Sequence, residues 1–144
     1  MKIINEMKLV LPGYSINEAF ARVAVSTFFA QLNPTVEEIS DIKTAISEAV
    51  TNCIVHAYKE KIQDIYVVAR VLENNIAYIK IRDKGCGIAN IEQAMEPLFT
   101  TSSNEERAGL GFVVMQSFMD SVKVSSTVDK GTTVIMQKKI LSRK

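Results

Sequence analysis

Apolar residues recur along the chain with two different periods, which divide it into helical and extended segments. Between Ile39 and Ala57 they recur every three or four residues, which is the spacing of one face of an α-helix. Over residues 65–71 and again over residues 77–81 they alternate with other side chains, as on a strand with one buried face. Asn74-Asn75 lies between these two runs and suits a tight turn. The pattern therefore predicts a long helix followed by a β-hairpin.

The rest of the chain predicts shorter elements on both sides of this unit. Ser15 with Glu18, and Thr35 with Glu38, have the spacing of a capping box, so each pair is expected to open a helix. The remaining patterns predict, in chain order, a strand over residues 7–11, a helix from residue 15 to about 32, a helix over residues 112–119 and a hairpin over residues 122–140. The expected fold class is α+β, a mostly antiparallel mixed sheet with helices on one face.

Composition narrows the class of protein. The 144 residues are 47% apolar and suit a single domain, 1–144, with a sizeable core. Seventeen basic and sixteen acidic residues leave no basic excess, which argues against a nucleic-acid partner. We expect no membrane span or signal peptide, because the apolar runs are too short. Cys53 and Cys86 are isolated in the sequence, which favours reduced thiols and a cytoplasmic protein.

Glycine is sparse and clustered. Five of the six glycines lie in Asp83-Lys84-Gly85-Cys86-Gly87, in Gly109-Leu110-Gly111 and at position 131, where backbone must approach something closely. Asp83 follows the expected strand at a period of two, so its carboxylate should point toward the core and need a donor. A ligand amino group would supply that donor. Alternatively, Asp83 caps the tight turn at Gly85, and the motif alone leaves both readings open.

The long helix carries a second candidate pair. Glu48 and Asn52 are four residues apart and share a face beside the apolar stripe. The carboxylate could accept a proton from an attacking hydroxyl, and the amide oxygen suits Mg²⁺. An ordinary solvated pair on the helix surface would look the same. His56 lies one turn further on and is expected to support the site through packing or a hydrogen bond rather than as a ligand.

The second glycine cluster precedes the helix expected over residues 112–119. A helix start offers free N–H groups and a positive dipole end, and glycines would let phosphate approach them. Arg107 precedes the cluster and could pair with terminal phosphate oxygens, or could simply lie in solvent. The chain has no P-loop motif and none of the His-Arg-Asp or Asp-Phe-Gly motifs of eukaryotic-type kinases.

The order and spacing of these motifs resemble the GHKL ATP-binding superfamily, whose two-layer α/β sandwich is called the Bergerat fold. Ser47–Asn52, His56-Ala57-Tyr58 and Glu96–Thr101 look like its anti-sigma serine-kinase branch, and the resemblance covers nearly the whole chain. It implies ATP or ADP with Mg²⁺. Asp83, assisted by Thr132 or Thr133, would then receive the adenine amino group.

The resemblance also implies roles for the other candidate residues. Asn52 would hold Mg²⁺, Glu48 would be the general base for a serine hydroxyl, and Arg107 would sense the γ-phosphate. Residues 97–108 would form an ATP lid, although Ser102-Ser103-Asn104 departs from the basic residue and proline common in the family. Arg22 would lie on the surface that partners share. Further nucleotide contacts would come from Gly85, Gly87, Thr100, Thr101, Gly109, Leu110 and Gly111.

The implied function is that of an anti-sigma factor. In its ATP-bound form the protein would inhibit a sporulation sigma factor of RNA polymerase, and it would phosphorylate an anti-anti-sigma protein on serine. A homodimer is also implied, with the first strand as a candidate edge. The alternatives are a histidine-kinase-like domain and an ATP-binding regulatory module without chemistry. Glu48 separates them, because neither alternative needs a carboxylate base at that position.

Overall fold

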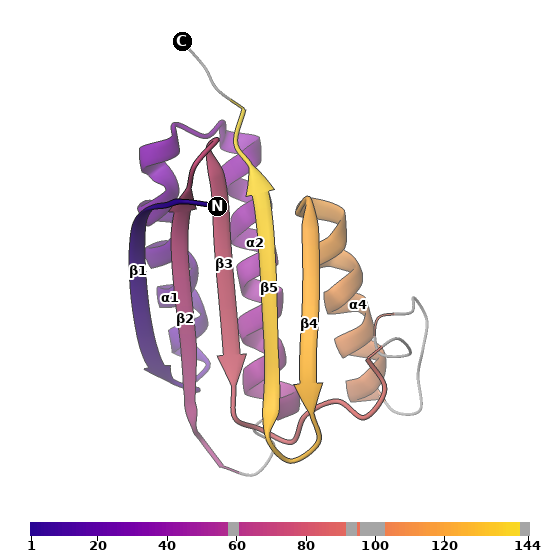
Figure 1. Cartoon of the computed structure of the whole chain (residues 1–144). Helices are drawn as coiled ribbons and strands as arrows, with labels where there is room; N and C mark the ends of the chain where they lie inside the picture. Colours follow the sequence, from indigo (N-terminus) through magenta and orange to yellow (C-terminus); the bar gives the residue numbers. More distant parts are fainter. Residues whose placement is uncertain (58–60, 92–94, 96–102, 142–144) are drawn as a thin grey trace.

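The computed structural model describes residues 1–57, 61–91, 95 and 103–141; for residues 56 and 103–110 it describes the backbone. The strands form one sheet in the order β1-β2-β3-β5-β4, and each of the described pairings is antiparallel. Helices cover one face of this sheet and leave the other open (Figure 1). The elements are β1 (Ile3–Pro12), α1 (Ile16–Phe28), the 3₁₀-helix η1 (Phe29–Leu32), α2 (Val36–Asn52), the π-helix η2 (Cys53–Ala57), β2 (Asp64–Leu72), β3 (Ile76–Asp83), α4 (Ser103–Phe118), β4 (Ser121–Thr127) and β5 (Gly131–Lys139).

The expected α+β class is therefore confirmed, and the core lies between the sheet and the helices. Ile42 and Ile46 of α2 are fully buried and belong to the same apolar cluster as Ile79 and Ile81 of β3. Because side chains alternate along a strand, Asp83 continues the inward-facing row of β3. None of the described helices is long and apolar enough to span a membrane.

One of the two expected capping boxes forms. Thr35 and Glu38 cap α2 reciprocally: the Glu38 amide donates to the Thr35 hydroxyl, and the Thr35 amide donates to the Glu38 carboxylate. The box expected at Ser15 and Glu18 is wrong, since Ser15 makes no side-chain cap. The Glu18 carboxylate instead accepts a hydrogen bond from the hydroxyl of Ser47, so a tertiary contact replaces the local one.

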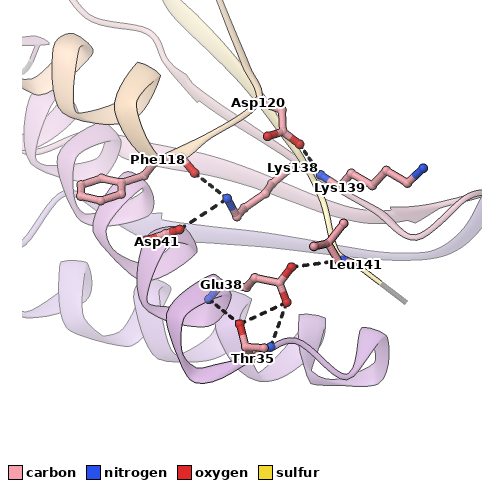
Figure 2. A network of polar contacts seen from close by, with 8 residues as sticks. All are labelled: Thr35, Glu38, Asp41, Phe118, Asp120, Lys138, Lys139 and Leu141. Carbon is pink, nitrogen blue, oxygen red and sulfur yellow. Dashed lines mark hydrogen bonds and ion pairs between the residues drawn. The ribbon is translucent and has the colours of Figure 1, made fainter. Parts of the chain in front are cut away.

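The first turn of α2 also anchors the end of β5 (Figure 2). The second carboxylate oxygen of Glu38 accepts from the amide of Leu141 at 3.1 Å. Lys138 donates to the Phe118 carbonyl at 2.9 Å and pairs with Asp41 at 3.4 Å. These contacts join α2, α4 and β5 at the end of the sheet opposite Asp83. They fix the end of β5 against the first turn of α2.

Candidate functional site

The sequence-predicted residues converge at one end of the molecule. The C-terminal end of α2, the end of β3, the start of β5 and the first half of α4 lie at the same end of the sheet (Figure 1). Asn52 is the last residue of α2, Asp83 is the last of β3, and Gly131 is the first of β5. The antiparallel register brings Asp83 directly opposite Thr132.

The helix that carries Glu48 and Asn52 changes its winding immediately after Asn52. Continuous α-helical periodicity was expected to Ala57, but residues Cys53–Ala57 form a π-helix. Single π-turns are rare and occur often at functional sites. Within this turn the carbonyl of Ala57 accepts from the Cys86 amide at 3.3 Å, and the thiol of Cys53 donates to Asp83 of β3.

Asp83 is buried, with 5% of its surface exposed, and it is held at both carboxylate oxygens. Oδ1 accepts from the amide of Gly85 at 2.9 Å and from the amide of Thr132 at 3.2 Å. Oδ2 accepts from the thiol of Cys53 at 3.6 Å. Burial raises the pKa of Asp83, and these hydrogen bonds, which favour the charged form, oppose the rise. Asp83 therefore does cap the turn at Gly85, and its Oδ2 is left with a weak thiol donor.

The two threonines considered beside Asp83 lie on opposite faces of the sheet. Thr132 is buried on the helix side, where its hydroxyl lies 2.8 Å from that of Ser126. Thr133 is opposite Arg82, whose side chain points away from the core. Of the two, only Thr132 shares a face with Asp83, and Ser126 holds it there.

Three of the glycines are explained by close backbone contacts. A β-carbon at Gly85 would collide with the Ala57 carbonyl oxygen, and one at Gly131, where φ is +114°, would collide with the carbonyl oxygen of Asp83. Gly87 likewise lies against the backbone of Thr127. These glycines join the turn after β3 to the end of the π-helix and to the β4–β5 hairpin. They allow these segments to approach one another closely at the site.

Gly111 differs, because it faces side chains of the candidate site. A β-carbon there would lie 3.2 Å from Glu48 Oε2, 3.2 Å from Asn52 Oδ1 and 3.3 Å from Asn52 Nδ2. Asn52 Nδ2 is buried and has no hydrogen-bond partner among the residues that the structure describes. A buried amide without a partner is costly, and a half-turn of the amide exchanges its nitrogen and oxygen. This position is therefore suited to a polar ligand group.

The helix after the second glycine cluster begins earlier than expected. It was predicted over residues 112–119, but α4 runs from Ser103 to Phe118 and includes Gly109-Leu110-Gly111. The residues before the cluster include two glutamates in the first turn, an arginine and an alanine, which favour a helix. The prediction of a helix N-terminus at the glycines is therefore wrong for this structure, and the glycines lie within the helix.

Other predicted residues and segments lie partly or wholly outside the described part of the chain. Thr100 and Thr101, with the lid segment 97–102, lie outside the described residues. Residues 103–108 of the expected lid, including Arg107, form the first turns of α4. Arg22 lies on α1, has a side chain 40% exposed, and pairs with Glu18 at 3.8 Å.

Sequence reasoning missed two side chains that hold the site. Cys53 was assigned only to the apolar stripe of the helix, and Ser126 was assigned only to a strand. The apolar stripe carried the signal for Cys53. Residues of that stripe face the sheet, so the thiol could have been expected to point toward the strand that ends at Asp83. Nothing in the sequence distinguished Ser126, whose hydroxyl accepts from the Ile88 amide at 2.7 Å and bridges two loops.

A hollow of about 460 Å³ lies by the β4–β5 hairpin. Side chains that point away from the core, such as Arg82, Ser125 and Thr133, contribute to its lining. Its lining also includes Asp83, Ser126 and Thr132 but neither Glu48 nor Asn52, so it borders the Asp83 end of the site described above.

Comparison with known proteins identifies the family. A family model described as the histidine kinase-like ATPase domain matches residues 16–138. The anti-sigma F factor of Caldanaerobacter subterraneus subsp. tengcongensis is 56% identical over 140 residues, which cover 97% of each chain. The chain belongs to the anti-sigma F factor family. Another member, from Bacillus subtilis, is 46% identical over 140 residues, which cover 97% of this chain and 96% of the relative.

Solved structures agree with this family assignment at the level of the fold. The RsbU and RsbW domains of a Mycobacterium tuberculosis protein match with a TM-score of 0.69 and 17% identity, over 94% of this chain and 32% of theirs. The histidine kinase domain of a blue-light activated kinase from Erythrobacter litoralis matches with a TM-score of 0.55 and 19% identity, over 73% of this chain and 46% of that one. The resemblance to the GHKL fold is confirmed.

Proposed function

We propose that this protein is an ATP-dependent protein serine kinase that also acts as an anti-sigma factor. In its ATP-bound form it inhibits a sigma factor of RNA polymerase, one used in sporulation, and it phosphorylates an anti-anti-sigma protein on serine. The observation that carries the proposal is the contact of Gly111 with Glu48 and Asn52, at the same end of the sheet as the buried Asp83. The names of the relatives support the sigma-factor partner.

The residues present fit a nucleotide with Mg²⁺. Asp83 Oδ2 would accept a hydrogen bond from the amino group of adenine, since the backbone donors among the described residues bond to Oδ1. The amide of Asn52, unpaired at Nδ2 among the described residues, would turn its oxygen to Mg²⁺, which favours hard oxygen ligands. Gly111 lets the backbone of α4 approach both side chains closely. Thr132 lies beside Asp83 and would complete the adenine contact.

Glu48 supplies the proposed chemistry. ATP provides the phosphoryl group: the serine oxygen bonds to the γ-phosphorus, the bond to the β-phosphate oxygen breaks, and ADP leaves. Glu48 would accept the proton of the serine hydroxyl as this bond forms. Asn52, one turn away on the same helix face, would place the metal and hence the phosphates. Glu48 is half-buried and therefore open to a partner's side chain.

The remaining assignments belong to the same proposal. The lid, residues 97–108, with Thr100, Thr101 and Arg107, would close over the phosphates, and Gly85, Gly87, Gly109 and Leu110 would line the nucleotide. Arg22, half-exposed on α1, would contact the partners. The protein would act in the cytoplasm as a homodimer.

The test is phosphoryl transfer in a defined mixture. The protein is incubated with γ-labelled ATP, Mg²⁺ and an anti-anti-sigma protein from a related sporulating bacterium, and the label is followed on both proteins. We expect acid-stable label on the partner, as phosphoserine gives. Label that is lost in acid would instead support a histidine-kinase-like domain, and binding of ATP without transfer would support a non-catalytic module.

A further inference from the structure

The two oxygens of the Asp83 carboxylate are held by different kinds of donor. Two backbone amides, those of Gly85 and Thr132, hold Oδ1. Among the described residues, the donor to Oδ2 is the thiol of Cys53. Cys53 is 4% exposed and lies on the π-helix immediately after Asn52. The chemistry proposed above does not use it.

The hydrogen bond from the thiol helps to set the direction in which Oδ2 points. The two oxygens turn together about the Cβ–Cγ bond, and the two amides restrain that rotation from the Oδ1 side. A donor at Oδ2, from a different element, fixes the plane of the group. The thiol is a weak donor, and an ionised oxygen has lone pairs for two partners. It can therefore orient Oδ2 and still leave the oxygen able to accept a second hydrogen bond.

We propose that Cys53 is a positioning residue that orients Oδ2 of Asp83 to receive the exocyclic amino group of adenine. It thereby contributes to the selection of adenine over purines that lack this amino group. The inference rests on the proposed adenine contact of Asp83. Cys53 can take this role because its thiol, at the end of the Asn52 helix, lies against the last residue of β3.

The experiment compares two nucleotides across a small set of full-length variants. Dissociation constants are measured calorimetrically for ADP and for purine riboside diphosphate, which lacks the amino group. The variants are Cys53→Ala, Cys53→Ser and, as a matched control, Cys86→Ala, because Cys86 is exposed. Thermal unfolding of each variant reports folding, and Cys53→Ser keeps a hydroxyl donor of similar size should Cys53→Ala unfold.

The expected result is a loss that depends on the amino group. Cys53→Ala should weaken ADP binding by about threefold to tenfold, the range for one weak hydrogen bond, and purine riboside diphosphate by less than about twofold. Cys53→Ser should recover part of the ADP affinity, and Cys86→Ala should match the parent protein.

Two outcomes would overturn the inference. Equal losses for both nucleotides would mean that Cys53 only packs the pocket, and no loss for ADP would mean that Asp83 needs no help from the thiol. Failure of the proposed function looks different: Asp83→Asn would then leave the ADP affinity of the otherwise unchanged protein intact, whatever Cys53 does.

Discussion

Gly111 of α4 faces Glu48 of α2 so closely that a β-carbon on the glycine would lie 3.2 Å from the carboxylate oxygen Oε2. Glycine within a helix costs about 0.5–1 kcal/mol relative to alanine. A helix of this length that keeps glycine at that position gives up stability, and the space gained lies beside the two side chains proposed to act on phosphate. The stability lost by keeping glycine at position 111 is therefore consistent with a role for this position in binding phosphate.

Gly111→Ala should separate stability from nucleotide binding. Alanine improves the helix, and the atoms nearest to its methyl group would be the ends of the Glu48 and Asn52 side chains, which can shift by a few tenths of an ångström. We expect the free energy of unfolding to be unchanged or to rise by up to about 1 kcal/mol. Affinity for Mg-ATP and the rate of phosphoryl transfer should fall at least tenfold.

The control is Ser117→Ala, on an exposed position of the same helix. It also improves helix propensity but should leave nucleotide affinity unchanged. Equal affinity of the parent and Gly111→Ala proteins for Mg-ATP would show that the space beside Glu48 is not part of the nucleotide site.

Asp83→Asn should weaken the binding of adenine nucleotides and stabilise the free protein at neutral pH. Folding raises the pKa of Asp83, so the folded state favours the protonated carboxyl. The stabilising contribution of that protonation is fully present below the unfolded pKa and is lost as the pH rises through the folded pKa. Asparagine cannot ionise and avoids this loss.

The measurement is chemical denaturation of both proteins at pH 7 and near pH 4. The variant should be the more stable protein at pH 7, and its advantage should shrink as the pH falls. Its affinity for ADP at pH 7 should be lower by one to two decades, the cost of about 1.5–3 kcal/mol for a charge-assisted hydrogen bond. An advantage that is the same at both pH values would contradict the assigned pKa direction.

Gly131→Ala should disrupt the fold at the site end. The residue has a φ of +114°, which alanine rarely adopts, and its β-carbon would strike the backbone of Asp83 and Lys84. We expect a loss of more than about 2 kcal/mol in the free energy of unfolding. Lys130→Ala, at the exposed neighbouring position, should change it by less than about 0.5 kcal/mol. A stable Gly131→Ala protein would contradict the close backbone contact.

Glu38→Ala should destabilise the opposite end of the molecule without affecting nucleotide binding. The substitution removes half of the capping box and the acceptor for the Leu141 amide. A loss of about 1–3 kcal/mol in unfolding free energy is expected. Glu37→Ala, at an exposed position in the same turn, is the control. Reduced ADP affinity in folded Glu38→Ala protein would contradict the separation of the two ends.

The sequence was sufficient for the fold where the periodicity was uninterrupted. The alternation in β2 and β3 and the apolar stripe of α2 predicted elements that the structure confirms. The pattern failed where tertiary contacts compete with local ones. Glu18 had the spacing of a capping residue, but the Ser47 hydroxyl takes its carboxylate.

Some members of the candidate site were predicted from the sequence, but Cys53, Ser126 and the local geometry were not. Asp83, Glu48 and Asn52 could be chosen from spacing, because each residue's face follows from its helix or strand. The π-turn at Cys53 could not, since it changes the winding of the helix without changing its apolar pattern. The start of α4 was also missed, because helix-favouring residues before the glycines extend the helix through them.

The central claim is that Glu48 makes this a protein serine kinase, and phosphoryl transfer by Glu48→Gln tests it most directly. The variant keeps the shape of the side chain and removes its ability to accept a proton. The measurement is the rate at which label moves from γ-labelled ATP to the serine of an anti-anti-sigma protein, with Mg-ATP and sigma-factor affinities measured alongside. We predict unchanged affinities and a rate reduced at least a hundredfold, within the usual range for a general base. Transfer at the parent rate would contradict the account.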